Sequence, residues 1–156
     1  MKNTILTVVA VFAINTVFAQ KVKESEVPAM VKTSFQNSFK GAKAEKWEKE
    51  KDGNYEAEFD WNKTEMSANF SADGKLIQSE QEIKTAELPK TVSDYVTKNY
   101  AGYKVSEAAK ITDASGAISY EAEVKKGKEE MDLIFDSNGN FLKKEVESKD
   151  KDEKKD

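Results

Sequence analysis

Apolar residues recur along the chain with two periods, and each period predicts a different kind of element. In residues 27–41 and again in residues 88–102, apolar side chains stand at every fourth position around a leading proline, which favours a short helix with one apolar face. Gly41 and Gly102 stand where such a helix ends in a left-handed residue. Helices this short are marginal alone, so we expect each to pack on a sheet.

Alternation of apolar and polar residues follows each predicted helix and indicates half-buried strands. Residues 55–61 alternate apolar with acidic side chains, and residues 120–124 repeat the pattern. Asp73-Gly74 favours a hairpin turn, because such turns require positive φ. The expected strands are residues 46–51, 55–61, 66–70 and 76–83 in the first half and residues 104–112, 118–126, 129–136 and 141–147 in the second.

The same blocks appear twice at a nearly constant spacing. Val27 corresponds to Leu88 at an offset of 61 residues, and Tyr55 corresponds to Tyr120 at an offset of 65 residues. Such spacing predicts one structural unit copied in tandem. We therefore expect an α+β fold, a tandem repeat of one helix plus a roughly four-stranded antiparallel meander, with the helix packed on one sheet face. The expected divisions are a signal peptide at 1–19, repeat 1 at 24–84, repeat 2 at 85–147 and a charged disordered tail at 148–156.

The start of the chain has the composition of a secretory signal peptide. Lys2 precedes a largely apolar run, and small residues end at Ala19, which predicts cleavage before Gln20. The run is too short to span a bilayer comfortably, which takes ~20 apolar residues. We expect a periplasmic or secreted protein without membrane insertion after signal cleavage; the alternative is an N-terminal anchor left uncut.

Composition excludes several classes of function. The chain has 29 acidic and 25 basic residues, no His and no Cys, and every basic residue is Lys. The commonest general base and the usual zinc ligands are therefore missing, and no basic stripe favours nucleic acid. We expect a non-enzymatic protein with no catalytic residues, no cofactor and no metal. A hydrolase that uses carboxylates alone remains an alternative, and Asp136-x-Asn138-x-Asn140, superficially like a calcium loop, is better explained as a hairpin turn.

Four short blocks carry a resemblance to a known family: Phe39-Lys40-Gly41-Ala42-Lys43, Lys46-Trp47-Glu48-Lys49, Tyr55-Glu56-Ala57-Glu58-Phe59 and Asp73-Gly74-Lys75-Leu76. In this order, and duplicated over roughly residues 24–147, they resemble the PepSY-like, beta-lactamase-inhibitor-like tandem-repeat exported proteins of Bacteroidetes-type bacteria. The second half departs from the pattern with Ala108 in place of Trp47.

The resemblance implies an exported module that binds another protein or peptide. PepSY domains are associated with peptidase propeptides, and the beta-lactamase inhibitor protein has a similar tandem build and binds its enzyme with the concave face of its sheet. Neither role transfers by fold alone. The hypothesis is a protein-interaction or hydrolase-inhibitor-like role through the sheet face. The alternative is a small-ligand-binding or envelope-stress protein with a pocket between helix and sheet.

The residues expected to contact a partner lie on the polar sides of the strands. They are Trp47, Glu56, Glu58, Asp60, Glu121, Glu123 and Asp132. Acidic residues would contribute mainly steering and specificity, and Trp is a frequent interface anchor. The alternatives are a solvated outer face, which antiparallel sheets commonly have, and core packing for the aromatic residue. We expect no apolar neighbour that would raise a carboxyl pKa on this exposed face. The partner's identity and the oligomeric state stay open.

Overall fold

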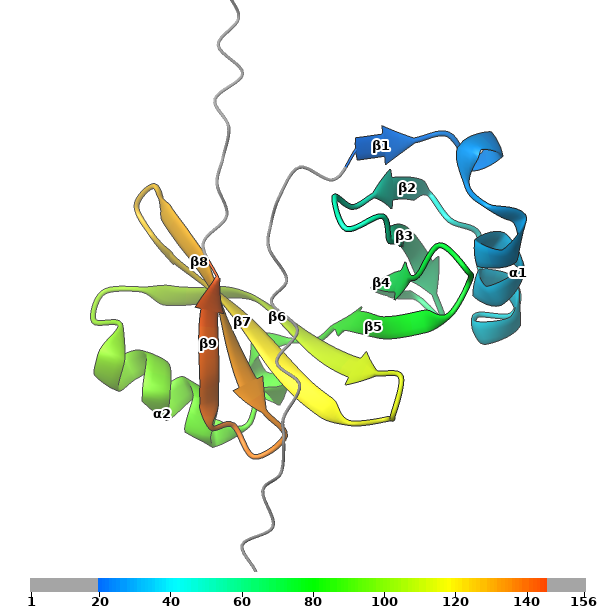
Figure 1. The fold of residues 1–156 in the computed structure, drawn as a ribbon. Helices are drawn as coiled ribbons and strands as arrows, with labels where there is room; N and C mark the ends of the chain where they lie inside the picture. Colours follow the sequence, from blue (N-terminus) through cyan, green and yellow to red (C-terminus); the bar gives the residue numbers. More distant parts are fainter. Residues whose placement is uncertain (1–19, 146–156) are drawn as a thin grey trace, which may run out of the picture.

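The computed structural model describes residues 20–145 (Figure 1). The signal peptide expected at 1–19 and the charged tail expected at 148–156 lie outside these residues. The described part is α+β, as predicted. Its helical elements are η1 (Glu24–Glu26), α1 (Ala29–Ser38), η2 (Thr85–Glu87) and α2 (Lys90–Asn99). Its strands are β1 (Gln20–Val22), β2 (Lys46–Lys49), β3 (Tyr55–Trp61), β4 (Thr64–Phe70), β5 (Leu76–Glu82), β6 (Lys104–Asp113), β7 (Ile118–Lys126), β8 (Glu129–Asp136) and β9 (Phe141–Glu145).

All nine described strands form one antiparallel sheet, and each strand pairs with its neighbours in the chain. Hairpin turns fall where the glycine and asparagine signals predict them. Asn62 and Lys63, for example, both have positive φ and close the β3–β4 hairpin. Two features were not expected from the sequence: the three-residue edge strand β1, and the β5–β6 pairing that joins the two halves into one sheet.

Each helix begins after a short 3₁₀ turn that is built in the same way in both halves. The backbone N–H of Lys23 donates to the Glu26 carboxylate at 2.8 Å, and that of Lys84 donates to Glu87 at 2.9 Å. α1 ends before Gly41, which has a φ of +84° as the sequence predicts. These reciprocal caps satisfy backbone donors at the entrance of each helix.

Two hydrophobic cores lie under the two helices. The first gathers Phe35 and Phe39 of α1 against Phe59 of β3, with ring centroids 4.9 Å and 4.7 Å from Phe59. In the second, Tyr95 of α2 stacks on Phe141 at 4.8 Å. Aromatic pairs at these separations add to the free energy gained by burying apolar area.

Both helices cover the same face of the sheet. Residues directly opposite in a ladder point to the same face, and the pairs run Met66–Gln81, Gln81–Lys110 and Lys110–Tyr120. Met66 packs on the first core and Tyr120 on the second, so this row connects the two.

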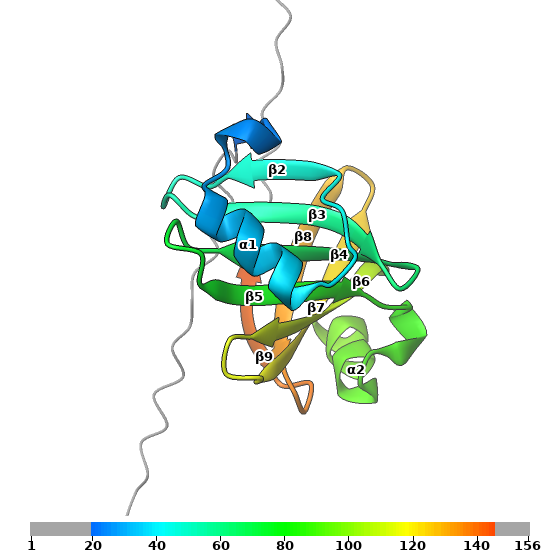
Figure 2. The same cartoon turned by 90° about the vertical axis from the view of Figure 1, so that its right-hand side faces the viewer.

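The sheet twists strongly between its halves. α1 lies across β2–β5 (Figure 2), and α1 and α2 lie at opposite outer sides of the molecule (Figure 1). The face without helices therefore lies on the inner side of the bend. No helix within residues 20–145 combines the length and apolarity needed to cross a bilayer.

Candidate functional site

The helix-free face of the sheet collects acidic side chains from both halves of the chain. Because side chains alternate along a strand, residues between core positions point to this face. We call this surface the helix-free face and define it by Glu48, Glu56, Glu58, Asp60, Glu80, Ile111, Glu121, Glu123, Asp132, Ile134, Lys143 and Glu145.

The structure brings six of the seven residues predicted as partner contacts to this one face. Glu56, Glu58 and Asp60 come from β3, and Glu121 and Glu123 come from β7. Asp132 of β8 lies directly opposite Glu123. The acidic residues of the two halves therefore belong to one continuous surface, although whether a partner uses it stays a prediction.

Trp47, the seventh predicted contact, is a core residue, and its expected interface role is wrong. Its side chain is only 4% exposed. The indole packs edge-on against Phe35 of α1, with ring centroids 5.5 Å apart. The reason is the register of β2, in which Trp47 lies opposite Ala57 and so shares the face that the helix covers.

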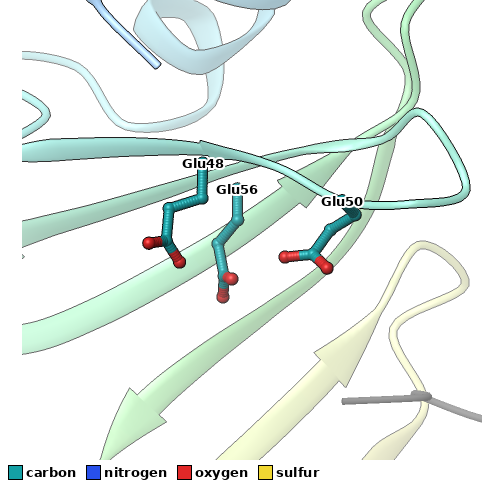
Figure 3. A group of neighbouring side chains, drawn as sticks. All are labelled: Glu48, Glu50 and Glu56. Atoms are coloured by element: carbon teal, nitrogen blue, oxygen red, sulfur yellow. The ribbon is translucent and has the colours of Figure 1, made fainter. Parts of the chain in front are cut away.

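Three carboxylates approach one another in the first half of the helix-free face. Glu48 and Glu56 are opposite each other on β2 and β3, Glu50 follows β2, and the three point away from α1 (Figure 3). One oxygen from each lies within 4.8 Å of the others. Burial, followed by the charge of Glu80, raises the pKa of Glu56 to about 7. Burial and the charge of Glu48 also raise the pKa of Glu50.

The spacing of these three carboxylates would let them contact one cation. Oxygen ligands suit calcium, which takes about six to eight of them. Three side chains supply only part of such a set. The candidate calcium-like segment in the second half has a different role, because the Asp136 carboxylate accepts the backbone N–H groups of Asn138 and Asn140 at 2.9 Å and 2.8 Å. Asp136 thus closes the β8–β9 turn, in agreement with the hairpin interpretation.

At the centre of the helix-free face, two isoleucines are buried outside both cores. Ile111 is 5% exposed and lies opposite Glu80, and Ile134 is 4% exposed and lies opposite Glu121. Burial is the main cause that raises the pKa of Glu121, to about 9, and the charge of Glu80 adds to it. Burial raises the pKa of Glu80 as well. The expectation that this face lacks apolar neighbours able to shift a carboxyl pKa is therefore wrong.

Sequence reasoning missed Glu80, Glu145 and the role of the two isoleucines. β5 reads Leu-Ile-Gln-Ser-Glu-Gln-Glu, in which polar residues fall on both faces, so alternation does not single out Glu80. Its environment depends on the β5–β6 pairing, which joins segments far apart in the sequence. The available signal was Ile134, an apolar residue in the polar phase of its strand.

The lysines of this face are held by several carboxylates. Lys46 contacts Glu48 at 3.0 Å and Glu58 at 2.8 Å. Lys125 contacts Glu123 at 2.8 Å, and Lys143 pairs with Glu145. Acidic side chains outnumber these cations on the defined face, so the surface has a negative potential.

The fold and this surface define a class of protein with a tandem helix-and-sheet build. The chain belongs to the family described as beta-lactamase-inhibitor-like, PepSY-like, which matches residues 16–78 and 55–143. The resemblance drawn from the sequence blocks is thus confirmed. Among proteins with curated descriptions, none has a matching sequence.

Solved structures from Bacteroides share the fold. A DUF2874-family protein from Bacteroides ovatus is 21% identical with a TM-score of 0.66, over 80% of this chain and 91% of that one. A BLIP-like protein from Bacteroides fragilis is 20% identical with a TM-score of 0.63, over 80% and 90%. A Bacteroides eggerthii protein, whose description assigns it provisionally to the periplasm, is 15% identical with a TM-score of 0.67, over 77% and 88%.

Proposed function

We propose that this protein is an exported, non-enzymatic binding module that recognises another protein through the helix-free face of its sheet. The observation that carries the proposal is the continuity of that face. Both helices lie on the opposite side, and carboxylates of β3, β5, β7 and β8 form one surface across both halves. A broad, helix-free sheet lined by charged groups can supply steering and specificity to a protein interface.

The proposal includes a tandem origin for the two halves. Each has a 3₁₀ turn with a reciprocal cap, a ten-residue helix and a following antiparallel meander. The family match supports it, and the BLIP-like description of the Bacteroides fragilis neighbour suggests a hydrolase as the class of partner. Surface complementarity over a hydrolase cleft would inhibit without any catalytic group on this chain.

Export is part of the same proposal. The leader pattern at residues 1–19 and the provisional periplasmic description of one structural neighbour support it. Amino-terminal sequencing of protein recovered from the envelope fraction tests it, because cleavage would leave Gln20 as the first residue. A chain that keeps Met1 would contradict export by a cleaved signal.

The experiment for the binding role is capture followed by reconstitution. Immobilised protein starting at Gln20 is exposed to envelope extract, retained proteins are identified by mass spectrometry, and each is purified and tested for direct binding and for change in its hydrolase activity. The variant E58Q/D60N/E123Q alters the helix-free face, whereas E24Q/D94N alters exposed acids on η1 and α2. Loss of binding only in the first variant supports the proposal. Equal binding by both would place the interface elsewhere and end it.

The packing of the helix layer does not favour the alternative ligand pocket. Phe35, Phe39 and Phe59 have ring centroids between 4.7 Å and 5.8 Å apart in the layer between α1 and the sheet. Rings in such contact form a filled core. We therefore base the proposal on the helix-free face alone.

A further inference from the structure

The centre of the helix-free face combines a small apolar floor with acidic neighbours. Ile111 and Ile134 are almost fully buried there, although neither belongs to the core beneath a helix. In the ladders, Glu80 lies opposite Ile111, and Glu121 lies opposite Ile134. Each carboxylate therefore stands beside an alkyl side chain on the same face.

The charged groups around this centre are mostly acidic. β7 adds Glu123, β8 adds Asp132, and β9 adds Glu145 with its ion-paired Lys143. Glu80, Asp132, Glu145 and Glu123 all act electrostatically on Glu121 and oppose its ionisation. Concentrated negative charge of this kind attracts a cation, and a cation in turn favours the ionised carboxylates.

We propose that the helix-free face receives a lysine- or arginine-containing segment of the protein partner, with one cationic side chain seated between Glu80 and Glu121 over Ile111 and Ile134. This inference rests on the proposed function and names the chemistry of the partner at that same face. Charge complementarity selects the cationic head, and the isoleucine floor selects the alkyl stem that lysine and arginine carry behind it.

The apolar floor distinguishes this occupant from a metal ion. A calcium ion requires oxygen ligands on several sides, and Ile111 and Ile134 supply none. A long cationic side chain uses both parts of the site, because its methylene groups cover the isoleucines while its head group meets the carboxylates. Glu80 and Glu121 hold protons in the free protein at neutral pH because burial disfavours their ionised forms, so binding of a cation releases protons.

The test measures binding of matched synthetic peptides to the chain starting at Gln20. The peptides alternate serine with lysine, with arginine or with glutamine. Isothermal titration calorimetry in two buffers of different ionisation enthalpy gives the affinity and the number of protons released. The variant E80Q/E121Q neutralises the centre. The control E24Q/D94N removes the same number of acidic residues at exposed positions of η1 and α2, so both variants have equal net charge.

We expect the lysine and arginine peptides to bind, with proton release at neutral pH, and the glutamine peptide not to bind. E80Q/E121Q should weaken binding by about 10-fold or more and abolish the proton release, since a charged hydrogen bond contributes ~1.5–3 kcal/mol. E24Q/D94N should stay within about threefold of wild type. Circular dichroism confirms folding of both variants. Equal weakening in the two variants would reveal diffuse charge attraction and overturn the proposal, as would binding of calcium but of no peptide.

The outcomes for the two proposals are separable. A protein partner that is lost with E58Q/D60N/E123Q, together with cationic peptides that do not bind, would leave the proposed function and remove this inference. Peptides that bind at Glu80 and Glu121, with no envelope protein retained by the face, would remove the proposed function instead.

Discussion

Gly139 in the β8–β9 turn lies directly against Thr91 in the first turn of α2, whose hydroxyl donates to the backbone carbonyl of Asn138 at 2.8 Å. The first half contains a corresponding contact, in which Gly74 of the β4–β5 turn lies against the Met30 backbone of α1. In both halves a hairpin turn thus touches the helix that precedes it, and a glycine allows the close approach.

Replacing Gly139 with alanine should therefore destabilise the protein through two effects. The added Cβ would overlap the Thr91 hydroxyl, and the φ of +79° disfavours any residue with a Cβ. We expect a loss of about 3 kcal/mol in the free energy of unfolding, measured by urea denaturation. G116A is the control, because Gly116 has a φ of +84° but open space around it, and it should cost only about 1 kcal/mol. Equal losses would show that the contact with Thr91 does not matter.

Substitutions of Trp47 separate its packing from its polar atom. The side chain is buried, and its indole N–H has no acceptor within the described part of the chain. Trp47→Ala should cost about 3–5 kcal/mol because it leaves a cavity beside Phe35. Trp47→Phe should cost less than about 2 kcal/mol, since it keeps most of the ring contact and removes an unpaired donor. Thermal and urea unfolding measure both, and a Phe variant as unstable as the Ala variant would contradict this account.

The stability of the protein should fall as pH rises from acid to mildly alkaline conditions. The pKa of Glu56 is raised from 4.5 to about 7, and that of Glu121 to about 9. Between the ordinary and the raised values the folded state holds more protons than the unfolded state, so the free energy of unfolding decreases with pH. E121Q removes one such group. It should exceed wild type at pH 8 by on the order of 2 kcal/mol and match it near pH 4.

A matched acid tests whether this pH dependence belongs to the buried carboxylate. E24Q changes an exposed residue of η1 and should leave the pH profile of wild type unchanged. Urea denaturation at several pH values gives the slopes. A profile for E121Q with the wild-type slope would show that Glu121 is not the source.

The separation of the two cores predicts additive effects at corresponding helix positions. Val31 of α1 and Val92 of α2 are both 0% exposed, one in each core. Each Val→Ala substitution should cost about 2 kcal/mol. Sites that share no contacts usually add within about 0.5 kcal/mol, so V31A/V92A should lose about 4 kcal/mol. A double-mutant cycle in urea measures the sum, and a clear coupling energy would mean that the cores communicate through the β5–β6 ladder.

Local patterns predicted the elements well because the forces that select them act over a few residues. β3 begins and ends at Tyr55 and Trp61 as its alternation indicates, and the helix stripes place Phe35 and Val96 in the cores. Trp47 was misplaced because β2 is only four residues long with polar neighbours, so alternation is consistent with either face. Its side is decided by the pairing with Ala57.

The centre of the helix-free face could not be predicted for a different reason. The environments of Glu80 and Glu121 depend on which strands meet at the junction and on how far the sheet bends there. Both are long-range properties, whereas the sequence shows only that these glutamates are polar residues on strands. The predicted acids of β3 and β7 were placed on the correct face, but the shift in the pKa of Glu56 requires neighbours from β2 and β5.

The antiparallel pairing of β5 with β6 also has an evolutionary meaning. Glu80 comes from the first half of the chain, and Ile111, Glu121 and Ile134 come from the second. A solitary ancestral unit would have ended at a bare strand edge and lacked this acidic pocket floor altogether. Fusion of two units therefore did more than double an existing scaffold: the seam created a chemical environment that neither parent possessed, on which selection could then act.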